Sequence, residues 1–261
     1  MNARLEIESV ATEPAPLQLV KTLGKALSLL DWVAKAEHPI TVGALAQRSG
    51  FSRPTTYRLV NTLVAAGFLE QNAVDGRLTI GYGILPLAAS LLDTNRLRIE
   101  ALPHLQSLAA TVNSRVNLGV LHLQKIMILA GGEKPSLPTV RARFGQTVPV
   151  HTCALGKAIL SGLPTEEVKV IIAAQPLVPR TPHTITTLPA LLDDLARIRK
   201  RGYSTELREN TLTSCCIGVP IFNGNDQPVA AISVSGRSLE ALEKDIEHVL
   251  GTAELISHLV F

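Results

Sequence analysis

The stretch ITVGALAQRSGFSRPTTYRLVNTLVAAGFL, residues 40–69, decides how the first third of this chain folds. A first helix is expected here, with Thr41 as its N-cap and Gly50 as the residue that ends it. Ser52 is placed to cap a second helix, and Pro54 lies in the first turn of that helix, where a missing N–H costs nothing. Two short helices joined by a tight turn are typical of a helix-turn-helix.

A helix before this stretch and a hairpin after it complete the expected domain. The segment FLEQNAVDGRLTIG, residues 68–81, alternates apolar and polar residues around Asp75-Gly76, which predicts a type I′ hairpin. Apolar residues at helical spacing share one face of the preceding helix, and these are Leu19, Leu23, Ala26, Leu27, Leu30 and Val33. Three helices followed by a hairpin predict a winged helix-turn-helix.

The charge distribution singles out the same region. Residues 38–69 contain no Asp or Glu, whereas Arg48, Arg53 and Arg58 all lie among them. The net charge of the chain is +3, and residues 17–80 contain seven Lys and Arg against four Asp and Glu, so the whole excess lies there. Basic residues without compensating carboxylates, on an element narrow enough to enter a groove, indicate DNA binding.

The leading half of the second helix in this stretch is the expected DNA-reading surface. Arginine bonds to guanine in a bidentate way, threonine contacts a thymine methyl group or a phosphate, and asparagine reads adenine. The hairpin adds a cation for a phosphate or the minor groove. The candidate DNA contacts are Ser52, Arg53, Thr55, Thr56, Tyr57, Arg58, Asn61 and Arg77. The alternative is that the helix pair forms an interface between subunits.

The composition describes a well-packed chain with room for two domains. It has 261 residues, of which 46% are hydrophobic and 18% charged, and this balance excludes a disordered chain. Cys153, Cys215 and Cys216 do not form a disulfide framework, so a cytoplasmic location is expected. No run approaches the roughly 20 apolar residues of a membrane helix. Residues 1–16 are expected to be a flexible tail without a signal peptide.

A linker helix and a second domain are expected after the hairpin. The helical pattern from Ile84 to Val112 breaks near Pro103. Many short strands with hairpin signals then alternate with helices, which favours an α+β fold around a largely antiparallel sheet. Strands are expected near residues 116–122, 126–130, 139–143, 203–207, 216–222 and 229–235, with helices from 154, over 165–174 and 188–201, and from 239. The expected domains are a tail (1–16), the winged helix-turn-helix (17–81), the linker helix (82–100) and the second domain (101–261).

Two parts of the second domain are candidates for a small-molecule site. In HTCALGKAIL, residues 151–160, the free N–H groups at the start of a helix would point at an anion. On the strand 229–235, two serines face one side, and a thiol on a neighbouring strand can join them. The candidate residues are Ala154, Leu155, Gly156, Cys216, Ser233 and Ser235. The alternatives stay open: the glycine only permits close packing, and the thiol and hydroxyl groups belong to small core residues.

Catalytic and metal-binding motifs are missing from the sequence. There is no nucleophile elbow, no H-E-x-x-H pair and no phosphate-binding loop. The spacing of the potential metal ligands matches no zinc signature, and these are His151, Cys153, His183, Cys215 and Cys216. We therefore expect no enzyme activity, no metal and no cofactor.

Five segments, in this order, resemble the isocitrate-lyase-regulator (IclR) family of bacterial transcription factors. They are ALAQRSGFSRPTTYRLVNTLVAAGFLE, GRLTIG, PVHTCALGKAIL, TITTLPALLDDLARIRKRGYS and CIGVPIF…VAAISVSG, and the resemblance spans roughly residues 20–258. It implies a winged helix-turn-helix, a linker helix and a C-terminal effector domain of the GAF/profilin-like type. It also implies a homodimer or a dimer of dimers on palindromic operator DNA, with a small organic acid, aromatic or sugar-derived, as effector.

The resemblance also carries the family's effector-contacting positions onto this sequence. They fall on Ala154, Leu155, Gly156, Glu206, Cys216, Ser233 and Ser235. Three departures accompany it: Thr56 stands where the family usually has a buried Val or Ile, Leu78 replaces a usual Tyr, and Thr213 replaces a common Gly. The expected function is a DNA-binding regulator, repressor or activator, that responds to a small carboxylate. The alternative is a ligand-independent DNA-binding protein whose second domain only oligomerises.

Overall fold

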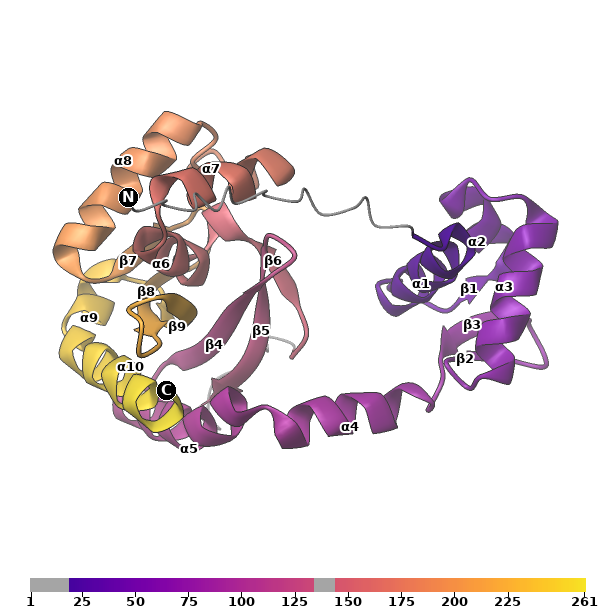
Figure 1. The fold of residues 1–261 in the computed structure, drawn as a ribbon, viewed down its shortest axis with the longest axis horizontal. Coiled ribbons are helices and arrows are strands. Elements are labelled where there is room, and N and C mark those ends of the chain that lie inside the picture. The colour runs from indigo at the N-terminus through magenta and orange to yellow at the C-terminus, as the bar shows by residue number, and fades with distance from the viewer. Residues whose placement is uncertain (1–18, 134–143) are drawn as a thin grey trace, which may run out of the picture. The chain divides into compact units, whose positions relative to one another are not determined.

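A computed structural model gives the structure of the chain and describes residues 19–133 and 144–261. The chain forms two compact units that divide between Leu91 and Leu92 (Figure 1). The tail expected at residues 1–16 and the strand expected near 139–143 lie outside the described residues.

The first unit is a winged helix-turn-helix, as predicted. Its strands form one antiparallel sheet in the order β1-β3-β2, and a single apolar core lies among the helices and this sheet, with Leu29, Leu45 and Val60 at its centre. The elements are α1 (Lys21–Ala34), β1 (Ile40–Thr41), α2 (Val42–Ser49), α3 (Arg53–Ala65), β2 (Leu69–Gln71) and β3 (Arg77–Ile80).

The predicted helix ends around the turn are confirmed. The Thr41 hydroxyl accepts a hydrogen bond from Ala44 N at 3.3 Å, which caps α2. The Ser52 hydroxyl accepts from Thr55 N at 3.4 Å, which caps α3. Gly50, which ends α2, has a φ of 67°, a conformation that glycine adopts without steric cost. These local bonds fix the angle at which α3 leaves the turn.

The hairpin turn differs from the type I′ turn that Asp75-Gly76 predicts. Gly76 N donates to Asn72 O at 2.9 Å, so the turn comprises residues 72–76 rather than two. A type I′ turn needs two residues with positive φ, and within this turn only Gly76 has one, at 67°. The Asn72 side chain decides the geometry, because its Oδ1 accepts from Val74 N at 2.8 Å and holds a longer loop closed.

The break in the long helical region lies at Asn95 instead of near Pro103. The first part, α4 (Ile84–Thr94), crosses the division between the units, and α5 (Arg96–Thr111) follows and continues through Pro103. Asn95 has extended backbone angles, and its side chain accepts from Arg98 N at 2.9 Å. An N-cap residue therefore starts a new helix where no proline is present.

The second unit is an α+β domain around a six-stranded antiparallel sheet, which confirms the predicted fold class. The strand order is β6-β5-β4-β9-β8-β7. The strands are β4 (Arg115–His122), β5 (Lys125–Gly132), β6 (Thr147–Pro149), β7 (Ser204–Leu207), β8 (Cys215–Phe222) and β9 (Pro228–Gly236). Of these, β6 was not expected from the sequence.

Helices cover both faces of this sheet (Figure 1). On one face, α5, α9 (Leu239–Glu243) and α10 (Ile246–Val260) pack over the larger apolar core. On the other, α6 (Ala154–Gly162), α7 (Thr165–Ala174) and α8 (Leu188–Arg201) enclose a second core. A short 3-10 turn, η1 (Val150–Thr152), leads into α6 and places the start of that helix on the sheet.

Part of the apolar row expected on one face of α1 lies in solvent. Leu23 and Leu27 are 58% and 55% exposed, whereas Leu29 and Val33 are buried. Apolar periodicity identifies an apolar helix face but does not show what packs against it. None of the helices in the described parts of the chain has the length and apolar character that crossing a bilayer requires.

Candidate functional site

One face of α3 presents basic and polar side chains to solvent. Arg53, Tyr57, Arg58 and Asn61 are exposed, and the opposite face packs into the core of the unit. Within the described residues, neither Arg53 nor Arg58 has an ion-pair partner. An exposed helix face with free guanidinium groups can contact phosphates and base edges in a major groove.

Ser52 and Thr55 lie at the start of the same helix, at the end that leads into a groove in helix-turn-helix proteins. Their hydroxyl oxygens are 2.8 Å apart, and the Ser52 hydroxyl also caps the helix. Both are partly or fully exposed, so either can turn toward a phosphate.

Thr56 is the one candidate DNA contact that the structure removes. Its exposed fraction is 0%, and its hydroxyl donates to Ser52 O at 3.2 Å. Helical spacing puts it on the same face as Leu59 and Val60, which are core residues. We therefore correct the expectation: Thr56 packs inside the unit, and its hydroxyl is satisfied by the backbone.

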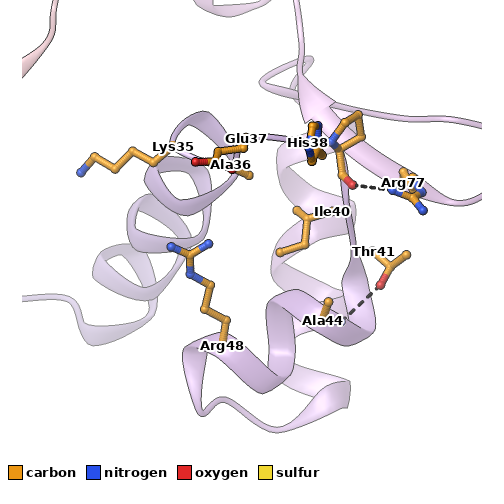
Figure 2. A pocket seen from close by; sticks show the side chains of 10 residues that line it. Lys35, Ala36, Glu37, His38, Ile40, Thr41, Ala44, Arg48 and Arg77 are labelled. Carbon is orange, nitrogen blue, oxygen red and sulfur yellow. Dashed lines mark hydrogen bonds between the residues drawn. The ribbon is translucent and has the colours of Figure 1, made fainter.

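Arg77 lies on the wing beside a hollow of about 570 Å³ on the first unit. Its Nη1 donates to Pro39 O at 3.1 Å, and its Nε lies 3.5 Å from Asp75. Figure 2 shows Arg48 extending from α2 toward Ala36 and Glu37 on the other side of the hollow. Because acidic and basic groups both line this hollow, we assign no anion to it, and Arg77 remains a candidate contact at its edge.

The second candidate site begins at the N-terminus of α6. Cys153 caps this helix, since its Sγ accepts from Gly156 N at 3.4 Å. The N–H of Gly156 is thus already used, and the two N–H groups before it, at Ala154 and Leu155, are those that a helix start leaves for a ligand. A Cβ at residue 156 would lie 2.0 Å from Val150 O, so this glycine is also required for close packing.

Strand pairing brings the polar candidates into one row across the sheet. Glu206 pairs with Cys216, and Cys216 pairs with Ser235, so the three side chains share a face. The thiol of Cys216 donates to the Ser235 hydroxyl at 3.3 Å. Ser233 lies two residues before Ser235 on the same face of β9 and pairs with Gly218. A Cβ added at Gly218 would be 2.6 Å from Ala154 O. The start of α6 therefore rests on the strands that carry these side chains.

The side chain of Leu155 is buried in the apolar core beneath α6. A Cβ added at Gly119 would lie 2.9 Å from its Cδ1. Only the backbone of Leu155 is therefore placed to meet a ligand.

Glu206 is a buried carboxyl group in this row. Burial raises its pKa above the ordinary value, although hydrogen bonds from the backbone N–H groups of Asn210 and Glu209 oppose that shift. Those bonds, 3.1 Å and 2.6 Å long, both end on Oε1. Glu206 can therefore hold a proton at a higher pH than an exposed carboxylate does, and a protonated carboxyl donates hydrogen bonds.

The thiols near the site are inert. Burial raises the pKa of Cys153 to about 12, and burial also raises the pKa of Cys216. A thiol with a raised pKa stays protonated at neutral pH, and the protonated form is a poor nucleophile. Across residues 19–133 and 144–261, no three His, Cys, Asp or Glu side chains gather in a way that could hold a metal ion.

Lys157 is a polar centre that sequence reasoning missed. It is 1% exposed, and its Nζ lies 2.7 Å from Glu209 Oε1 and 3.0 Å from Asp194 Oδ2. The ion pair connects α6 to the loop whose N–H groups hold Glu206, so it supports the site without lining it.

Comparison with known proteins matches both units. The IclR helix-turn-helix domain model matches residues 22–73, and the model described as bacterial transcriptional regulator IclR C-terminal matches residues 89–258. The transcriptional repressor IclR of Escherichia coli (strain K12) is 33% identical over 230 residues, which cover 87% of this chain and 84% of that protein.

Solved structures are similar over nearly the whole chain. Thermotoga maritima IclR shares 30% identity with a TM-score of 0.71, covering 92% of this chain and 99% of that one. An IclR homologue from Microbacterium hydrocarbonoxydans, in complex with 4-hydroxybenzoate, shares 25% identity with a TM-score of 0.78, covering 92% of this chain and 98% of its own.

Proposed function

Since the chain belongs to the IclR family of transcriptional regulators and has the family's DNA-binding helix-turn-helix, we propose that the exposed face of α3 reads its operator and that the second unit binds a small organic acid. The observation that carries the first half is the acid-free basic face of α3. From residue 38 to residue 69 no carboxylate offsets Arg53 and Arg58. Such a face attracts the phosphate backbone and leaves guanidinium groups free for base edges.

The DNA-contact set we propose is the expected set without Thr56. Phosphate contacts from Ser52, Thr55 and Arg77 position the helix, and base contacts from its exposed side chains give specificity. The proposed residues are Ser52, Arg53, Thr55, Tyr57, Arg58, Asn61 and Arg77.

The effector site we propose joins the start of α6 to the polar row on β7, β8 and β9. An effector carboxylate accepts from the N–H groups of Ala154 and Leu155 at the positive end of the helix. The raised pKa of Glu206 supports this arrangement, because its carboxyl group keeps its proton, and so does not repel an anion, up to a higher pH than an exposed carboxyl group does. Ser233, Ser235 and Cys216 supply further hydrogen bonds to the ligand. The 4-hydroxybenzoate complex of a relative supports an organic acid as the ligand class.

A homodimer is the assembly we propose, with a dimer of dimers as its extension. Exposed leucines support it: Leu23 and Leu27 on α1, and Leu87 and Leu91 on α4, are each more than half exposed. Exposed apolar rows on two helices favour packing against a helix of a second subunit. We propose that residues 82–100 link the DNA-binding domain (17–81) to the effector domain (101–261). Effector binding then favours one placement of the paired domains, which changes operator affinity by linkage.

Two measurements test this proposal. For the first, operator affinity is compared between the wild type and Arg58→Ala, with the exposed Lys169→Ala on α7 as a matched control. Weaker operator binding by Arg58→Ala alone supports the proposed DNA-reading face. Equal binding by the two variants would show that Arg58 does not belong to the DNA interface. For the second, small mono- and dicarboxylates are screened for a shift in melting temperature and in operator affinity. If no acid shifts either quantity, the second domain is a ligand-independent oligomerisation domain.

A further inference from the structure

A hollow of about 260 Å³ lies in the second unit, beside the C-terminal part of β5. Its apolar lining comes from α4, α5 and β5 and from one aromatic ring. None of the seven effector residues expected from the sequence lines it. The lining residues are Leu92, Arg98, Leu102, Asn117, Leu129, Ala130, Gly131, Glu133 and Phe144.

Two buried polar atoms of residues that line this hollow have no hydrogen-bond partner among the residues that the structure describes. Asn117 is 8% exposed, and its Oδ1 accepts no hydrogen bond. The Nε of Arg98 is also buried and donates none. A buried donor or acceptor left unsatisfied is unfavourable, so native structures almost always pair such groups. A vacant acceptor and a vacant donor, on two residues that line the same hollow, indicate a ligand that carries both a hydrogen-bond donor and a hydrogen-bond acceptor.

The charge balance favours an anionic ligand. Arg98 has no carboxylate partner in the described parts of the chain. Its contacts are a 3.4 Å bond from Nη1 to Leu92 O and the ring of Phe144, whose centroid is 6.0 Å away. The neighbouring pair, Arg115 with Glu133 at 3.4 Å, is neutral as a whole. One guanidinium charge is therefore left over, and arginine binds carboxylates through paired N–H groups.

We propose that this hollow is a second small-molecule site, which binds a flat monocyclic organic acid carrying a hydroxyl or amino group. The carboxylate pairs with Arg98, the hydroxyl or amino hydrogen bonds to Asn117 Oδ1, and the ring packs against Leu102, Leu129 and Phe144. The volume is below the roughly 300–1,000 Å³ of drug-sized pockets, which suits a single ring. Asn117 pairs across strands with Ser233, so this site adjoins the proposed effector site on the same sheet.

Isothermal titration of the full chain with 4-hydroxybenzoate tests this inference, which does not depend on operator binding. The wild type is compared with Arg98→Met and Asn117→Leu, which remove the proposed contacts, and with Ser235→Ala in the other site. Each variant is first checked by its melting temperature, and Arg98→Lys keeps the charge if Arg98→Met does not fold.

We expect saturable binding to the wild type, with one binding component that becomes at least about tenfold weaker in Arg98→Met and Asn117→Leu and that keeps its wild-type affinity in Ser235→Ala. If Arg98→Met does not fold, Arg98→Lys is expected to bind more weakly than the wild type but still measurably, since lysine lacks the paired N–H groups. No binding to the wild type, or full binding to Arg98→Met or Arg98→Lys, overturns the proposal. Loss of all binding in Ser235→Ala, with or without loss in Arg98→Met, also overturns it, because the acid then occupies the effector site alone. That last result would leave the proposed function intact.

Discussion

Replacing Lys157 with Met gives the largest loss of stability that we expect from one substitution in this protein. The Lys157 side chain is 2% exposed, and its partners Glu209 and Asp194 are 9% and 13% exposed. Removing the cation leaves two carboxylates with little solvent to screen them. Breaking a buried ion pair by removing one partner costs roughly 3–5 kcal/mol. For a unit of this size, about 1 kcal/mol corresponds to 2–4 °C in Tm, so we expect a fall of roughly 6–20 °C.

An exposed ion pair in the same unit provides the matched control. Lys169 and Glu166 are 2.7 Å apart on α7, with side chains 45% and 82% exposed. Such pairs contribute about 0–1 kcal/mol, so Lys169→Met should lower Tm by no more than about 4 °C. Both variants are measured by calorimetry or circular dichroism at one protein concentration, because an oligomer's Tm depends on it.

A second substitution separates loss of the ion pair from loss of packing. Adding Glu209→Gln to Lys157→Met removes one of the stranded charges, so the double variant should regain part of the lost stability. If Lys157→Met has the same Tm as Lys169→Met, the buried ion pair does not stabilise the domain. The inference that this ion pair holds the loop whose N–H groups bond to Glu206 would then be wrong.

Three smaller predictions concern the two sites. Thr56→Val should leave operator affinity unchanged in an anisotropy titration, because residue 56 is buried. A clear loss of affinity would show that Thr56 contacts the DNA after all. Ser235→Ala should blunt the effector's influence on operator affinity while basal affinity stays at the wild-type value, and a normal response would place the effector elsewhere. Burial raises the pKa of Glu206, so its stabilising contribution is complete below the ordinary carboxyl pKa and is lost as pH rises through the raised value. Glu206→Gln should therefore lose less Tm than the wild type between pH 5 and pH 8, and parallel losses in both proteins would contradict the raised pKa.

Local features of the fold could be predicted from the sequence because adjacent residues determine them. Thr41 and Ser52 cap the helices that follow them, and Gly50 ends the first, all within one turn of chain. The residues that form each strand and the side chains that share a face also follow from local alternation, which is why Ser233 and Ser235 were grouped correctly.

Features that depend on distant partners could not be predicted. Glu209 is 52 residues from Lys157, and no local pattern indicates that the two meet. The hollow beside Arg98 and Asn117 arises where α5 and β5 meet, and neither residue stood out in the sequence. Leu23 and Leu27 are a further example, because their spacing predicts an apolar helix face but does not show what packs against that face.

The salt dependence of operator binding tests the proposed DNA-reading face most directly. The slope of log K against log salt concentration is measured for the wild type and for the Arg53→Ala/Arg58→Ala variant on the same operator fragment. Each guanidinium group that meets a phosphate adds about 1 to the slope, and one that meets a base edge adds affinity, so the variant should lose affinity and its slope should become shallower by up to about 2. An unchanged slope with unchanged affinity would show that this face of α3 does not meet the DNA.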